Sequence, residues 1–124
     1  MRSKMVTGAV IALVFAAGVV TAALQQASQT RREPQFDNES VTVWKSIIMP
    51  NQPLALHRHD LGRTIVALQG GTLDVVDANG KTLKQMTWET GKAYWLGPDP
   101  PGEQHGDLNR TKEPIEVIVV QMKK

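Results

Sequence analysis

Between Val41 and Met122 the sequence is a succession of short runs of β-branched and apolar residues, each followed by turn-forming residues. The runs read VTVWKSIIM, LALHRH, TIVALQG, TLDVVD, TLKQMTW, KAYWLG and PIEVIVVQM. Two of them flank Asn79-Gly80, a dipeptide typical of a β-hairpin turn. The last run is apolar on both faces, which favours a central position in a sheet. The pattern predicts about six to eight short strands in an all-β sandwich or closed barrel.

An apolar segment precedes this region. Arg2 and Lys4 are followed by a run without charged residues from Met5 to Leu24. A basic start, an apolar stretch and small residues near its end are typical of an export signal, so residues 1–24 are predicted to be a signal peptide. The run is also close to the ~20 residues that span a bilayer, which leaves an uncleaved membrane anchor through residues 5–24 as the alternative. In both cases the remainder is expected to be exported, to the periplasm or beyond the cell.

Residues 25–40 are polar and show no periodicity, which predicts a linker ahead of a single domain over residues 41–124. The chain has no cysteine, so this domain is expected to depend on its core alone. The formal net charge is +2, and Arg2 and Lys4 account for all of it. A domain of zero net charge argues against a nucleic-acid or anionic-membrane surface.

The three histidines of the chain are the candidates for chemistry. His57 and His59 are two residues apart on a predicted strand, so both side chains should point to the same face, into the barrel. A third donor from another strand would complete a facial site for a divalent metal ion. His105 follows the Pro- and Gly-rich stretch GPDPPGEQ, where a further strand is expected to begin.

These residues resemble the two motifs of the cupin superfamily, G-x5-H-x-H-x3-4-E-x6-G and G-x5-P-x-G-x2-H-x3-N. The first motif is matched by Asn51, His57, His59, Arg63 and Gly70. The second is matched by Gly91, Pro100, Gly102, His105 and Asn109, with three extra residues before Pro100. The resemblance implies an RmlC-like jelly roll, or double-stranded β-helix. It also implies a metal ion, which could be iron, zinc, nickel, copper or manganese, held by the three histidines.

Asn51 and Arg63 depart from the first motif, and the two changes differ in their expected effect on the metal site. Asn51 replaces a glycine, which is mild because asparagine tolerates the left-handed backbone conformation of a turn. Arg63 replaces the glutamate that completes the family's metal site, and a guanidinium cannot bind a metal.

Arg63 therefore has two interpretations. In the first, three histidines hold the metal and Arg63 binds the anionic group of a substrate, an arrangement similar to that of cysteine dioxygenase. Tyr94, on the strand leading to the second motif, would then help to line the pocket. In the second, Arg63 pairs at the pocket mouth with Asp60, Asp107 or Glu103, and the metal site is degenerate.

Two acidic residues are candidates to support the site. If the strand holds its pleat, Glu103 and Asp107 lie on the same face as His105. Asp107 is the better placed to orient an imidazole or to neutralise Arg63.

The sequence leaves three functions open. One is a metal-dependent oxygenase or isomerase acting on a small anionic molecule, and another is a non-catalytic cupin that binds a small molecule. The third is a structural role, for example as the homodimer common among cupins. No general base stands out beyond the histidines.

Overall fold

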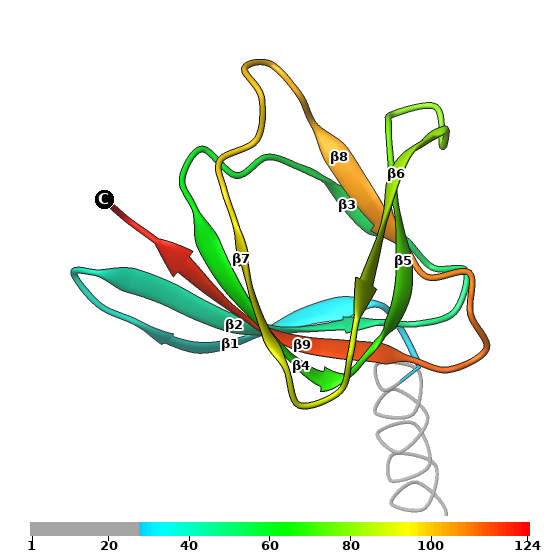
Figure 1. The fold of residues 1–124 in the computed structure, drawn as a ribbon, viewed down its shortest axis with the longest axis horizontal. Coiled ribbons are helices and arrows are strands. Elements are labelled where there is room, and N and C mark those ends of the chain that lie inside the picture. Colours follow the sequence, from blue (N-terminus) through cyan, green and yellow to red (C-terminus); the bar gives the residue numbers. More distant parts are fainter. Residues whose placement is uncertain (1–27) are drawn as a thin grey trace, which may run out of the picture.

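The structure, a computed structural model, describes residues 28–124, which form nine strands in two antiparallel sheets that face each other (Figure 1). The five-stranded sheet has the order β1-β2-β9-β4-β7 and the four-stranded sheet the order β3-β8-β5-β6. The strands are β1 (Arg31–Asp37), β2 (Val41–Ile48), β3 (Leu54–His57), β4 (Arg63–Gln69), β5 (Gly71–Val76), β6 (Thr82–Trp88), β7 (Ala93–Leu96), β8 (His105–Leu108) and β9 (Ile115–Met122). The all-β jelly roll is therefore confirmed.

The predicted export segment, residues 1–24, lies outside the described residues. Within residues 28–124 there is no helix of the length and apolarity needed to cross a bilayer.

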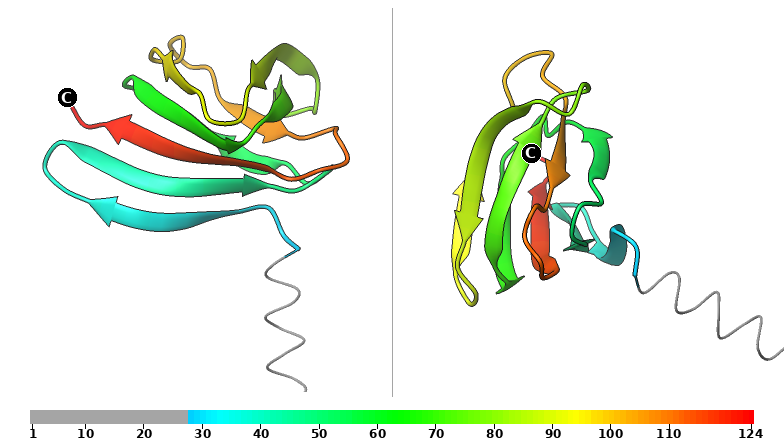
Figure 2. Two further views of the ribbon diagram at one scale, coloured as in Figure 1. Left: turned by 60° about the horizontal axis from the view of Figure 1, so that its bottom comes forward. Right: turned by 90° about the vertical axis from the view of Figure 1, so that its right-hand side faces the viewer.

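Strand β1 differs from the sequence-based expectation, which gave residues 25–40 as a linker. It pairs with β2 along its length and forms the outer edge of the five-stranded sheet (Figure 2, left). An edge strand with polar side chains has no alternation of apolar residues to reveal it. Pro34, next to a bulge in the register, weakens the strand signal further.

The hydrophobic core lies between the sheets and is built largely on β9. As expected from its apolar sequence, β9 is a central strand, between β2 and β4. Ile115, Val117 and Val119 alternate inward and are at most 5% exposed. Each contributes roughly 1.5–3 kcal/mol through burial. They pack with Ile48 and Leu73, among other buried residues, and Ile48, Val117 and Val119 also line a cavity of mixed polar and apolar walls.

Two motif asparagines hold the loops beside this cavity. Asn51 has φ of 58°, the left-handed conformation expected where the cupin motif has glycine. Its backbone N–H donates to the carbonyl of Asn109 at 2.7 Å. Asn109 is fully buried, and its side-chain amide donates to the carbonyls of Ile48 at 2.9 Å and Glu113 at 2.7 Å. These bonds fix the ends of β2 and β8 relative to each other.

Candidate metal centre

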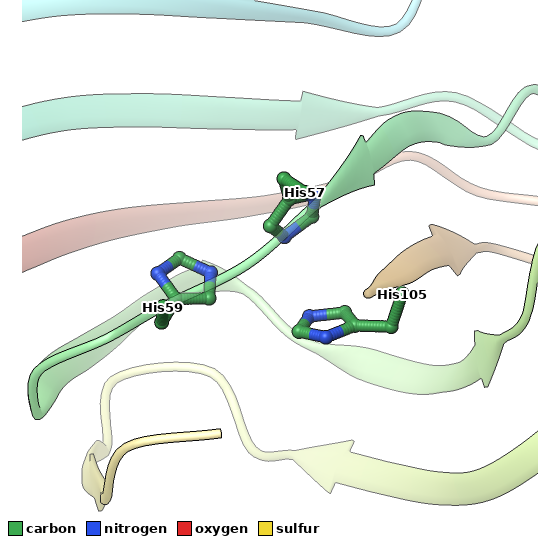
Figure 3. A group of neighbouring side chains, drawn as sticks. All are labelled: His57, His59 and His105. Carbon is green, nitrogen blue, oxygen red and sulfur yellow. The ribbon is translucent and has the colours of Figure 1, made fainter. Parts of the chain in front are cut away.

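The three histidines converge on one cavity between the sheets (Figure 3). His57 is the last residue of β3 and lies opposite His105, the first residue of β8. His59 follows in the loop after β3. The ring centroid of His57 is 4.9 Å from that of His59 and 4.5 Å from that of His105. One nitrogen of each ring lies within 4.8 Å of the other two, so three imidazole donors are gathered in one place.

The hydrogen bonds of Gln121 fix the tautomer of His59. The side-chain nitrogen of Gln121 donates to the carbonyls of Leu61 and Gly62 at 3.0 and 3.1 Å, so its Oε1 is free to accept. This Oε1 lies 2.7 Å from Nδ1 of His59, which must therefore carry the proton. The lone pair is left on Nε2. Sequence reasoning missed Gln121, although alternation from Val117 and Val119 points it inward.

In the other two rings Nδ1 also faces an oxygen atom, through a hydrogen bond in His57 and at a longer distance in His105. Nδ1 of His57 lies 2.8 Å from the carbonyl oxygen of Ala55, an acceptor that requires the proton on Nδ1. Nδ1 of His105 lies 3.4 Å from a carboxylate oxygen of Asp99. Metal-binding histidines are typically oriented like this, with the non-ligating N–H directed at a carbonyl or carboxylate.

The surroundings of the cavity favour neutral imidazoles. Burial lowers the pKa of His59 to about 4, and the nearby charge of Arg63 acts in the same direction. Burial also lowers the pKa of His57, although the bond to Ala55 opposes this effect. At neutral pH these rings are in the uncharged form that can bind a metal.

We expect the metal-free protein to lose stability between about pH 6.5 and pH 4. His59 has a pKa of about 4 when folded and about 6.5 when unfolded, so only the unfolded chain binds its proton in this range. The contribution of neutral His59 to the free energy of unfolding is fully present above about pH 6.5. It falls, by at most about 3 kcal/mol, as the pH decreases to about 4. Urea unfolding of chelator-treated chain should show a smaller loss for His59→Gln. An equal loss in the variant would contradict the assignment to His59.

Arg63 points into the cavity and is 7% exposed. Its Nη1 donates to the carbonyl of Gly97 at 3.3 Å and lies 3.8 Å from a carboxylate oxygen of Asp99. Burial lowers the pKa of the guanidinium, and the charges of Asp99 and Asp107 oppose this. Arginine remains charged under such conditions. Of the partners expected at the pocket mouth, Asp60 pairs instead with Arg58 at 2.6 Å.

Asp99 is the partner of Arg63 that sequence reasoning missed. Besides facing Arg63 and His105, its carboxylate accepts a bond from the backbone N–H of His59 at 2.7 Å. Burial raises the pKa of Asp99, but this bond and the electrostatic effects of His105 and Arg63 outweigh it and lower the pKa overall. The only signal in the sequence is that Asp99 lies in the loop that is longer than the cupin motif requires.

The two acidic residues expected near His105 are separated by the structure. Asp107 lines the cavity, with Oδ2 3.6 Å from Nε2 of His57 and Oδ1 4.0 Å from Nε2 of His105. Glu103 does not reach the cavity and lines an open groove with Pro100 and Gly102. The turn before His105 directs it away, because Gly102 has φ of 77° and so interrupts the strand pleat.

Tyr94 also lies away from the cavity, contrary to its expected role in substrate binding. It packs against the hydrophobic core, and its hydroxyl accepts a bond from the backbone N–H of Glu89 at 2.8 Å. The neighbouring Trp95 points outward and is 62% exposed. Core packing therefore accounts for Tyr94.

A second arginine, Arg32 on β1, reaches the cavity from the segment expected to be a linker. Its guanidinium lies 4.8 Å from the ring centroid of Trp44, at cation–π distance. The space in the cavity open to the centre of a water molecule is about 30 Å³. That is enough for an ion and roughly one or two waters.

The two facing antiparallel sheets have the architecture of the cupin, or double-stranded β-helix, fold. Comparison with solved structures confirms it. The chain is similar to a cupin domain from Bordetella pertussis, with 21% identity over 77% of this chain and 95% of that one and a TM-score of 0.65. It is also similar to an RmlC-like cupin family protein from Methanocaldococcus jannaschii, with 10% identity, 77% and 81% coverage and a TM-score of 0.57.

A further similar structure is that of an uncharacterised conserved protein with a double-stranded β-helix domain from Klebsiella pneumoniae. It shares 22% identity over 74% of this chain and 75% of that one, with a TM-score of 0.54. No protein-family model matches the chain, and the comparison with curated proteins found no match. At these identities the similarity establishes the fold, so the function must be inferred from the site.

Proposed function

We propose that this chain is an exported single-domain cupin that binds one divalent metal ion through His57, His59 and His105. The observation that carries the proposal is the orientation of the rings. Each Nδ1 faces an acceptor, which leaves three Nε2 lone pairs for an ion. Three imidazoles suit iron, zinc, nickel or copper, and the nearby carboxylates also make manganese compatible.

The dimensions of the site fit such an ion. Three nitrogens bound to one zinc ion at ~2.0–2.1 Å in a tetrahedral site lie roughly 3.3–3.4 Å apart. One nitrogen of each ring already lies within 4.8 Å of the other two, so movements of less than about an ångström by each ring bring them into range.

The charges around the cavity support a small anionic ligand beside the metal. Arg32, Arg63 and Lys84 line the cavity together with only two carboxylates, those of Asp99 and Asp107. A bound divalent ion would add to this positive excess and would act as a Lewis acid towards the ligand. Arg63, held by Gly97 and Asp99, could orient a carboxylate next to the ion. The small free space favours a ligand of few atoms.

An oxygenase- or isomerase-like reaction on such an anion is the enzymatic form of this proposal. The alternative is a non-catalytic cupin whose metal site is degenerate. The pairing of Arg63 with Asp99 favours that alternative, because a guanidinium already neutralised by a carboxylate holds a second anion less strongly.

Export is proposed from the sequence of residues 1–24 alone, with membrane anchoring through residues 5–24 as the alternative. A homodimer, implied by the cupin resemblance, stays a prediction.

Calorimetric titration of the chelator-treated chain, together with the visible spectrum of its Co²⁺ form, tests the metal site and its anionic ligand. With Zn²⁺ or Co²⁺ we expect one ion to bind per chain, and formate or acetate to change the visible spectrum of the Co²⁺ form. A folded chain that binds neither ion would refute the metal proposal. Metal binding without a response to either anion would refute the anionic ligand.

A further inference from the structure

The carboxylate of Asp107 faces the Nε2 atoms of both His57 and His105. On β8 it is two residues beyond His105, so both side chains lie on the face that lines the cavity. Its two carboxylate oxygens are divided between two rings, with Oδ2 3.6 Å from Nε2 of His57 and Oδ1 4.0 Å from Nε2 of His105. Its side chain is 15% exposed.

These contacts are too long for hydrogen bonds and join atoms of the wrong kind. His57 carries its proton on Nδ1, so its Nε2 presents a lone pair to a carboxylate oxygen, which also presents lone pairs. No N–H or O–H group among residues 28–124 donates a hydrogen bond to the Asp107 carboxylate. The other buried carboxylates differ, since Asp74 accepts from Arg110 and Gln85, and Asp99 accepts from the His59 N–H. A cation between the rings and Asp107 would satisfy all these acceptors at once.

The separations agree with a shared ion. Neighbouring ligand atoms about 2.0–2.2 Å from one metal ion lie roughly 3–3.6 Å apart. The 3.6 Å from Asp107 to Nε2 of His57 is at this spacing, and the 4.0 Å to Nε2 of His105 is slightly longer. Arg63 cannot supply the carboxylate ligand that the cupin motif has at its position, whereas Asp107 offers one from another strand.

We infer that Asp107 is the carboxylate ligand of this metal site, which would make the ligand set three histidines and one aspartate. The inference rests on the proposed metal binding and extends it to the fourth ligand. Asp99 then lies behind the site, where it orients His105 and pairs with Arg63, so the two aspartates have different roles.

A cysteine substitution tests this directly, because the chain has no cysteine of its own. Asp107→Cys loaded with Co²⁺ should show the near-ultraviolet charge-transfer band of a thiolate bound to cobalt. The matched variant Asp99→Cys should bind Co²⁺ without that band. Co²⁺ bound to Asp107→Cys without the band, or an equal band in Asp99→Cys, would overturn the assignment.

A second variant covers the case in which Asp107→Cys does not fold. Asp107→Asn should weaken Zn²⁺ binding by at least about tenfold and shift the visible spectrum of bound Co²⁺, and Asp107→Glu should recover part of the affinity. Unchanged affinity and spectrum in Asp107→Asn would refute Asp107 as a ligand while leaving the three-histidine site intact. A wild-type chain that binds no Co²⁺ would instead refute the metal proposal itself.

Discussion

Replacing His105 by alanine is expected to abolish stoichiometric metal binding. His105 is buried between His57 and Asp99, and no other histidine exists in the chain to take its place. Loss of a partner behind a ligand typically weakens metal binding by about 10–100-fold, and loss of the ligand itself should exceed this. Competitive titration against a chromogenic chelator measures the change.

Two controls define how this result is interpreted. Gln104→Ala changes an exposed residue next to His105 and should leave the affinity unaltered. Gln121→Leu removes the acceptor that orients His59, and should produce the intermediate loss of about 10–100-fold. Near-wild-type affinity in His105→Ala, with the fold retained by circular dichroism, would place the ion elsewhere.

Replacing Arg63 by methionine should destabilise the protein by about 3 kcal/mol. The guanidinium and the Asp99 carboxylate are each 9% exposed in their side chains, so the substitution leaves a buried negative charge without its cation. Removing one partner of a buried pair costs roughly 3–5 kcal/mol, and the Asp99 bond to the His59 N–H should limit the cost here. Urea unfolding at neutral pH measures the free energy.

The exposed pair of Lys123 and Asp37 is the matched control, and Lys123→Met should cost less than about 1 kcal/mol. The double variant Arg63→Met/Asp99→Asn should recover part of the stability lost in Arg63→Met, because the unpaired charge is gone. If Arg63→Met costs no more than the control, the pair does not stabilise the cavity.

The sequence predicted the fold well because its signals are local. Apolar alternation, turn dipeptides such as Asn79-Gly80 and the spacing within each of the two motifs all involve residues close together in the sequence. The convergence of three histidines followed from the cupin resemblance, since the motif positions carry the tertiary geometry with them. Strand β1 was missed because a polar edge strand buries too little apolar surface to show a period of two.

The charges around the site were harder to predict. Asp99 lies in a loop of irregular backbone, so no periodicity indicates where its side chain points. Arg32 reaches the cavity only because β1 pairs with β2. The predictions for Tyr94 and Glu103 relied on the alternation of side chains along a strand. Tyr94 instead packs against the hydrophobic core. Glu103 points away because Gly102 before it has a left-handed backbone conformation.

The contacts of Arg63 with Asp99 and Gly97 bear on both interpretations of this residue. It is neither at the mouth of the cavity nor free, because Asp99 and the Gly97 carbonyl hold it inside. The charge of Arg63, at the position where the cupin motif has a glutamate, is thus balanced by Asp99 from the extended loop. Asp107 remains to face the histidines.

The most direct measurement is an anomalous-difference map from crystals of the metal-loaded chain, recorded on both sides of the absorption edge of the metal. The proposal predicts one strong peak in the cavity, about 2.0–2.2 Å from Nε2 of His57, His59 and His105. A crystal that contains the metal but shows no peak there, or shows its peak at other residues, would contradict it.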